Sequence, residues 1–427
     1  MRMIFKKDTA LDYLLCFMLI MNMETIYFKR NDMFSALFEV MLCIVLCIYI
    51  AFSPSNIALS SLYYSKVSSV AGLYLIILLI TYYHGGENSI LANMLQKIVI
   101  FVIMVPLALL LIKKKTFRYI KEVLLVRYVN LFFVLSLLGF IFWALSSIGM
   151  TLPSITVPYS WGGNKTASGI FGLTFNIYLS DQSFSQGLYR FTFLLVEGPI
   201  AISYFALMAV IEMSCNVKPR LYVVLFFALC VFCTFTGFGM ILVAPIVALG
   251  LLTSQSVQLF KKSSYISHFS YFTIILGLVI VVPLVSLGLL SKKENTSSTE
   301  LHVADFVGGY RAFKENPLLG YGIGNYTPLH EYADNGLAGT SSAFMMGLVQ
   351  GGLIFVFSII LPIIISIVVM LYYRQYRLAI LPVFALVFYA NGLSDNSPIF
   401  AVIMALCIYY TLFLNHVQYS RLKMINE

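Results

Sequence analysis

An arginine and a glutamate seven residues apart, Arg190 and Glu197, stand in an otherwise apolar segment of this sequence. In a helix this spacing is close to two turns, so both side chains would share one face, about 10 Å apart along the axis. The Gly198-Pro199 pair that follows predicts a kink, because proline lacks the N–H of the helical hydrogen bond. One interpretation is a cation and a carboxylate that face a polar cavity opening outward. The alternative is a snorkelling arginine beside a simple kink.

Two further cations, Arg311 and Lys314, lie in the long polar stretch 291–340 between apolar segments. A capping box begins at Ser297 and predicts a helix that runs to about Glu315. Arginine offers a rigid fork that fits phosphate oxygens and keeps its charge at any physiological pH. The stretch therefore indicates a binding surface for a charged, sugar-like substrate, and arginines beside a membrane suit a lipid-linked phosphate or pyrophosphate.

The sequence NPLLGYGIGNY at 316–326 adds a glycine-rich turn with Gly320, Tyr321, Gly322 and Tyr326. Glycines let backbone N–H groups approach an anion closely, so this turn is a candidate substrate-binding element. A tight turn without a ligand is an equally good interpretation. The tyrosine rings could stack on sugar rings, or they could be anchors at the membrane interface.

Proton acceptors follow this turn directly. His330 and Asp334 could act as general bases if they meet a substrate hydroxyl. The alternative for each is an ordinary solvated position in a polar loop.

The elements that must position these residues are membrane helices. Hydrophobic residues make up 60% of the chain and charged residues only 11%, whereas soluble domains are about a quarter charged. Long apolar runs must form helices in a bilayer. We therefore expect an all-α fold, a polytopic membrane helical bundle of about 12 transmembrane helices with a large outer loop containing short helices. The expected spans are 10–28, 33–53, 67–83, 90–112, 128–150, 190–212, 221–237, 238–253, 270–290, 342–371, 378–393 and 397–415.

The distribution of Lys and Arg predicts the orientation, because these residues stay on the cytoplasmic side. Both termini are expected in the cytoplasm, and the loops 151–189 and 291–341 are expected outside. The whole chain, 1–427, is expected to form a single integral membrane domain. Lys29 and Arg30 disagree with the rule.

Composition also bears on partners. The net charge of +9 fits retention of basic residues beside membrane lipids and calls for no nucleic acid. All seven cysteines lie in or at the edge of apolar spans, so no zinc site is predicted. Glu24, Glu39 and Lys97 lie inside expected spans, either as packing or interfacial contacts or as an ion-coupling site.

These motifs resemble those of the O-antigen polymerase and O-antigen ligase superfamily. The resemblance rests on Arg311 followed by the NPLLGYG turn and then by SSAFMMGLVQGGLIF at 341–355. Weaker matches are the Arg190 to Pro199 element and TFTGFG at 234–239. In place of the His-Asn pair that ligases of the group usually carry, this chain has Ser341-Ser342, which favours a polymerase.

The resemblance implies a membrane glycosyltransferase of the bacterial inner membrane that needs no cofactor. Its substrates would be undecaprenyl-pyrophosphate-linked oligosaccharides, and its product an O-antigen, capsule or exopolysaccharide. Arg190 and Arg311 would stabilise the pyrophosphate leaving group, and Glu197, His330 or Asp334 would accept the acceptor's proton. A chain-length regulator protein is a candidate partner. The alternatives are an O-antigen ligase and a transporter or flippase for lipid-linked sugars.

Overall fold

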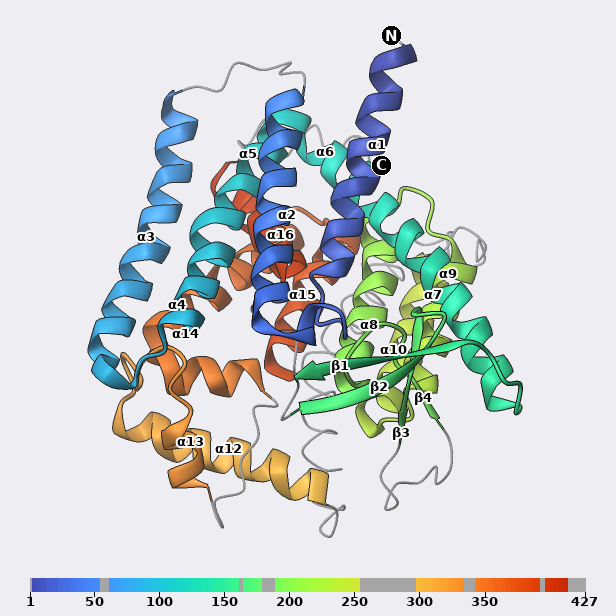
Figure 1. The fold of residues 1–427 in the computed structure, drawn as a ribbon. Coiled ribbons are helices and arrows are strands. Elements are labelled where there is room, and N and C mark those ends of the chain that lie inside the picture. Colours follow the sequence, from blue (N-terminus) through green and yellow to red (C-terminus); the bar gives the residue numbers. More distant parts are fainter. Residues whose placement is uncertain are drawn as a thin grey trace. The chain divides into compact units, whose positions relative to one another are not determined.

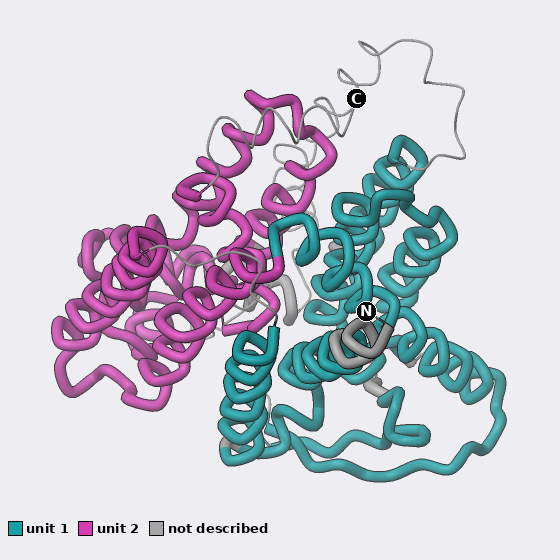
Figure 2. Tube along the Cα trace, turned by 90° about the horizontal axis from the view of Figure 1, so that it is seen from above, with its two compact units in different colours: residues 1–53, 116–278 teal, residues 54–115, 279–427 magenta. Residues whose placement is uncertain are grey.

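The structure, a computed structural model, describes residues 2–53, 61–160, 164–178, 189–253, 297–333, 342–391 and 396–413. Of the residues described, 78% are helical. It divides into two compact units, and each is described by itself (Figure 2). Unit 1 contains residues 1–53 and 116–278, and unit 2 contains residues 54–115 and 279–427. The expectation of one membrane domain stays a prediction.

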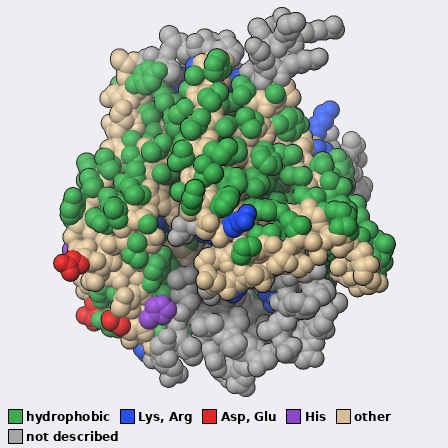
Figure 3. Space-filling model, viewed as in Figure 1, with side chains coloured by type: hydrophobic (Ala, Val, Ile, Leu, Met, Phe, Trp, Pro, Cys, Tyr) green, Lys and Arg blue, Asp and Glu red, His purple; other side chains and the backbone are tan. Residues whose placement is uncertain are grey.

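Within the described residues, six helices are long and apolar enough to cross a membrane: Met33–Phe52, Ser61–Asn88, Leu91–Lys115, Phe117–Ser147, Gly198–Cys215 and Ala343–Tyr372. Five shorter apolar helices correspond to other expected spans: Thr9–Met21, Leu221–Cys233, Gly239–Thr253, Tyr376–Ala390 and Pro398–Leu412. The expected span 270–290 lies outside the described residues. The helices fit a membrane protein, and the bundle of about 12 spans stays a prediction. On the face in Figure 3, hydrophobic side chains cover much of the surface.

Unit 1 is built largely of helices (Figure 1), and these pack through aromatic side chains. Phe132 lies 5.9 Å from Phe205 and 6.0 Å from Phe227 between ring centroids, which ties three helices together. The helical elements are α1 (Arg2–Met21), η1 (Phe28–Arg30), α2 (Asp32–Phe52), α6 (Phe117–Tyr119), η4 (Ile120–Leu124), α7 (Leu125–Ser147), α8 (Gly198–Cys215), α9 (Leu221–Cys233) and α10 (Gly237–Thr253).

Unit 1 also contains an antiparallel sheet, which the all-α prediction did not include. Its four strands, in the order β1-β2-β3-β4, are β1 (Ser154–Ser160), β2 (Asn164–Ile170), β3 (Thr174–Tyr178) and β4 (Tyr189–Phe191). In β1 only Val157 and Tyr159 are buried, which is the period-two pattern of a sheet with one covered face. The predicted outer loop 151–189 is therefore partly a folded sheet.

Unit 2 consists of helices around a kinked, glycine-containing helix. Its elements are α3 (Ser61–Gly85), η2 (Gly86–Asn88), α4 (Leu91–Lys97), the π-helix η3 (Ile98–Met104), α5 (Val105–Lys115), α12 (Ser297–Glu315), α13 (Thr327–Tyr332), α14 (Ala343–Tyr372), α15 (Tyr376–Asn391) and α16 (Pro398–Leu412). The α12 helix confirms the prediction from the capping box. A Cβ on Gly308 would lie 2.8 Å from the Leu329 carbonyl oxygen, so glycine in α12 permits close packing on α13.

Candidate functional site

Arg190 and Glu197 do not lie on one helix, and that prediction was wrong. Arg190 is in β4, where it pairs with Ile177 of β3, and α8 begins only at Gly198. Glu197 is the residue before the helix and has an extended backbone. Pro199 stands in the first turn of α8, where a missing N–H costs nothing, so it starts the helix and does not kink it.

The segment between the two residues is held by residues 24–26, which follow α1. The Val196 N–H donates to the Glu24 carbonyl, and the Ile26 N–H donates to the Leu194 carbonyl. An isolated bridge joins Thr25 to Leu195. These backbone contacts and a turn at Phe193 make the apolar run a non-helical connection, because its N–H groups find partners outside a helix.

The Arg190 side chain is partly buried and incompletely satisfied. Its Nε atom is buried and has no hydrogen-bond partner among the described residues. Burial lowers the pKa of Arg190 below its usual value, and the negative charge of Glu197 partly offsets this effect. A buried donor without an acceptor is costly, so a ligand that accepts from this N–H would be favoured.

The guanidinium group lies over the first residue of α8. A Cβ placed on Gly198 would be 3.4 Å from Nη1 of Arg190 and 3.0 Å from the Thr236 methyl group. Thr236 caps the start of α10, where its hydroxyl accepts a hydrogen bond of 3.1 Å from the Gly239 N–H. The N-termini of α8 and α10 therefore meet near Arg190, and each carries partial positive charge.

A tyrosine from the sheet completes this group. Tyr159 of β1 is buried, and burial together with the charge of Glu197 raises the pKa of its hydroxyl. We name Arg190, Glu197, Tyr159 and Thr236 the Arg190 cluster. It combines a cation, a carboxylate and two hydroxyls, which come from β4, β1 and the residues that precede α8 and α10.

The glycine-rich turn in unit 2 has a structural role. Backbone N–H groups of Gly320, Tyr321 and Gly322 donate to the carbonyls of Asn316, Val349 and Gln350, over 3.1, 2.8 and 3.0 Å. These three N–H groups are thus already paired, and they do not form the anion-binding cradle that the sequence suggested. The finding favours the alternative interpretation, a tight turn without a ligand.

The same turn is joined to α14 from the other side. The N–H groups of Leu353 and Ile354 donate to the carbonyls of Pro317 and Leu318 over 2.8 and 3.2 Å. These bonds are possible because α14 is kinked at Gly352, whose φ is 58° and ψ −161°. We name the paired segments 316–322 and 349–354 the glycine clasp.

The two candidate cations of the polar stretch, Arg311 and Lys314, are exposed. Arg311 donates through Nη1 to the Tyr332 carbonyl over 3.2 Å. Lys314 lies 4.7 Å above the Tyr310 ring in a cation–π contact. His330 is exposed on α13, and Asp334 lies outside the described residues.

The two candidate tyrosines of unit 2 pack against its core. Tyr321 and Tyr326 contact a buried cluster that includes Leu329 and Val349. The Tyr326 hydroxyl accepts a hydrogen bond of 3.2 Å from Asn93. Burial and the Tyr332 hydroxyl raise the pKa of Tyr321. Their edges are partly exposed, so stacking on a sugar stays a prediction.

Of the charges inside expected spans, Glu24 approaches Lys29 at 3.9 Å and Lys97 is buried 5.6 Å from the Phe355 ring centre. Two buried carboxylates were not identified from the sequence. Asp12 and Glu212 are fully buried and strongly paired, and each could have been found as an acidic residue within an apolar run.

No cluster of three or more His, Cys, Asp or Glu side chains that could hold a metal occurs among the described residues. The Arg190 cluster could instead bind an anion through Arg190 and offer Glu197 as a proton acceptor. No protein-family model, curated protein or solved structure matches this chain.

Proposed function

We propose that this chain is a membrane glycosyltransferase that polymerises undecaprenyl-pyrophosphate-linked oligosaccharide repeat units on the outer face of a bacterial cytoplasmic membrane. The observation that carries the proposal is the partly buried Arg190, whose buried Nε–H has no acceptor within the part of the chain that the structure describes and whose guanidinium lies near the start of α8. Such a site binds anions through charge and through oriented N–H groups.

The reaction is a substitution at the anomeric carbon of the donor sugar. A hydroxyl of the acceptor forms the new C–O bond, while the bond from the anomeric carbon to the pyrophosphate oxygen breaks. Negative charge grows on the departing pyrophosphate. Arg190 and the N-termini of α8 and α10 would stabilise that charge more strongly in the transition state than in the bound substrate.

The proton of the acceptor hydroxyl needs a base. Glu197 is the best candidate for this base because it is partly exposed and its charge acts on both Arg190 and Tyr159. A carboxylate that accepts this proton lowers the barrier to attack. His330 and Asp334 remain lesser candidates. Arg311 and Lys314 would supply further contacts to phosphate groups of a lipid-linked substrate.

The test is deletion in the native host, followed by complementation and separation of the surface glycan on a gel. We expect the deletion to reduce the ladder to a lipid core with one repeat unit. The wild type and Arg118→Ala should restore the ladder, and Arg190→Ala should not, at equal amounts of protein in the membrane. Arg118 is a matched control because it is an exposed arginine of the same unit, paired with Glu122.

Other results would identify the alternatives. Accumulation of unattached polymer in the deletion strain would indicate a ligase. An unchanged ladder would contradict the glycan-polymerising function and favour a transporter. Arg311→Ala, tested in parallel, measures whether the exposed cations of unit 2 take part.

A further inference from the structure

Thr192, two residues after Arg190, has a buried hydroxyl without a hydrogen-bond partner. The side chain is fully buried, and its Oγ1 atom finds no partner within the ranges that the structure describes. A hydroxyl can donate one hydrogen bond and accept two, so burying it unpaired costs free energy. The Nε–H of Arg190 is a second buried polar group in the same state. Two unpaired groups therefore stand close together in sequence at the end of β4.

The side chains of Thr192 and Arg190 lie on the same face of this segment. Side chains alternate between the two faces of a strand. Phe191 and Phe193 both face α7, where their rings pack edge-on against phenylalanine rings at 5.2 and 5.4 Å between centroids. Thr192 therefore points to the opposite face, as Arg190 does. Two residues of a strand span about 7 Å, a gap that an anion of the size of phosphate or pyrophosphate can bridge.

Backbone contacts fix the position of Thr192. The Leu195 N–H donates to the Thr192 carbonyl over 3.0 Å, and the Phe175 N–H donates to the Phe193 carbonyl over 3.2 Å. Phe193 has a φ of 56°, a left-handed conformation that a bulky residue keeps only where its surroundings hold it. The hydroxyl is thus placed before a ligand arrives, which lowers the cost of binding.

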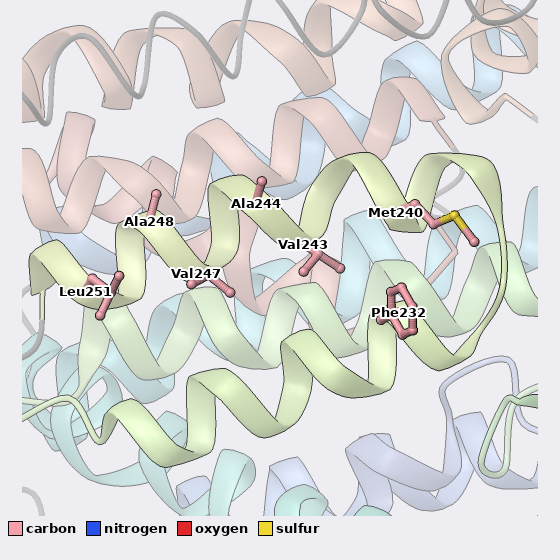
Figure 4. A pocket seen from close by; sticks show the side chains of 7 residues that line it. All are labelled: Phe232, Met240, Val243, Ala244, Val247, Ala248 and Leu251. Carbon is pink, nitrogen blue, oxygen red and sulfur yellow. The ribbon is translucent and has the colours of Figure 1, made fainter.

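The α10 side of the Arg190 cluster offers a ligand fewer hydrogen bonds. The Met240 N–H is already paired with the Thr236 carbonyl over 3.1 Å. From Met240 an apolar groove follows α10, and its lining, which includes Val243 and Val247, has no side-chain N–H or O–H group (Figure 4). A second donor for a ligand at Arg190 is therefore found on the β4 side and not along α10.

We infer that Thr192 is a second binding residue of the Arg190 site, whose hydroxyl donates to one oxygen of a phosphoryl anion while the Arg190 Nε–H donates to another. The inference rests on the proposed function, in which this anion is the pyrophosphate of the lipid-linked substrate, and it adds a residue to that site. Hydrogen bonds to charged oxygens are the stronger kind, and one ligand satisfies both buried groups at once.

The test measures the affinity of inorganic pyrophosphate for the full chain in phosphatidylcholine nanodiscs, together with the melting temperature without ligand. Thr192→Val keeps the shape of the side chain and removes the hydroxyl. We expect pyrophosphate to bind this variant on the order of tenfold more weakly, at an unchanged or higher melting temperature. Thr192→Ser keeps the hydroxyl and should retain most of the affinity.

Thr174→Val is the matched control. Thr174 begins β3, and its hydroxyl is also fully buried and without a partner among the described residues. Ile177 pairs with Arg190, so Thr174, three residues earlier on the strand, points to the opposite face of the sheet. Its replacement should leave the affinity for pyrophosphate at the wild-type value.

Three outcomes would overturn the inference. The first is equal affinity of the wild type and Thr192→Val, or equal losses in the valine variants of Thr192 and Thr174. The second is a fall in melting temperature for Thr192→Val without loss of affinity, which would show that a buried water and not the anion is the partner of this hydroxyl. The third is a wild type that does not bind pyrophosphate.

The glycan ladder of the native host keeps the proposed function separate from this inference. A ladder restored by the wild type and not by Arg190→Ala would support the proposed function even if Thr192→Val bound pyrophosphate normally. Weakened binding in Thr192→Val together with a ladder that Arg190→Ala restores would retain the anion site and contradict the proposed function.

Discussion

Two buried carboxylates of unit 1 differ from Arg190 in how their charge is paired. Asp12 is completely buried, accepts hydrogen bonds from the Tyr49 and Tyr119 hydroxyls, and forms an ion pair with Arg127. Arg190, in contrast, keeps a buried Nε–H without an acceptor among the described residues.

The Glu212 carboxylate is paired in the same way as that of Asp12, and unlike the Arg190 side chain. It is fully buried and accepts from the Asn216 side chain over 2.7 Å, and from Nε and Nη2 of Arg220 over 2.9 and 2.7 Å. Charges inside a membrane protein are functional candidates by default. The contrast refines that rule, since a saturated pair holds helices together and an unsaturated group is free to bind.

The sharpest test of this comparison replaces Arg190 by lysine. Lysine keeps the positive charge but loses the planar fork and the Nε–H, so we expect polymerising activity to fall about 10³-fold with little change in stability. In vitro polymer formation and the melting temperature in detergent measure the two effects. Activity close to wild type would show that charge alone suffices and that the unpaired Nε–H has no role.

For Arg220→Ala we expect a loss of stability as the main effect, in contrast to the loss of activity expected for the lysine variant of Arg190. Removing this arginine leaves the buried Glu212 carboxylate uncompensated, so the free energy of unfolding should fall by about 3 kcal/mol. Chemical denaturation in micelles measures the loss, with Arg118→Ala as a control that should leave stability unchanged. A stable Arg220→Ala protein with lost activity would reverse the assignment of the two kinds of charge.

Glu197→Gln separates the roles within the Arg190 cluster. The amide keeps the size and one acceptor oxygen but cannot take up a proton, so activity should fall about a hundredfold while substrate affinity is retained. Initial rates and binding of undecaprenyl pyrophosphate distinguish these quantities. Loss of affinity without loss of turnover would make Glu197 a positioning residue for Arg190.

The glycine clasp of unit 2 extends the comparison to uncharged groups. Gly320 has a φ of +65°, and a Cβ there would lie 2.5 Å from the Val349 carbonyl oxygen. Gly320→Ala should therefore cost about 2 kcal/mol of stability. Gly72→Ala is the matched control, because nothing lies within 4 Å of a Cβ at that position. Equal stability of the two variants would contradict the clasp.

The smallest effect is expected for His330→Ala. His330 is exposed on α13, so activity should stay within about twofold of wild type if Glu197 is the base. A rate measurement at neutral pH is sufficient. A loss of activity as large as that of Glu197→Gln would indicate that His330 of unit 2 is the general base.

Local signals predicted much of the helical structure. The α12 helix followed from its capping residue and its proline stop, and long apolar runs predicted the helices that could cross a membrane. These features depend on residues that are neighbours in sequence. The number of spans and the membrane orientation stay predictions.

The sheet and the clasp depend on partners that are distant in sequence. Arg190 belongs to an apolar run whose pattern favours a helix, but pairing with β3 and with residues 24–26 makes it extended. The acceptors of the Tyr321 and Gly322 N–H groups, Val349 and Gln350, are nearly thirty residues away. Spacing alone therefore suggested the candidate residues of the Arg190 cluster and misjudged the backbone that carries them.

The glycine clasp has a consequence for how this chain can vary. Its four hydrogen bonds between 316–322 and 349–354 join backbone to backbone, so they do not depend on most of the side chains involved. A Cβ at Gly320 or Gly352 would meet backbone atoms of the opposite segment, whereas the exposed Leu318 side chain meets no such limit. Substitutions should therefore accumulate at Leu318 and be rejected at the two glycines, in a pattern set by backbone geometry and not by chemistry.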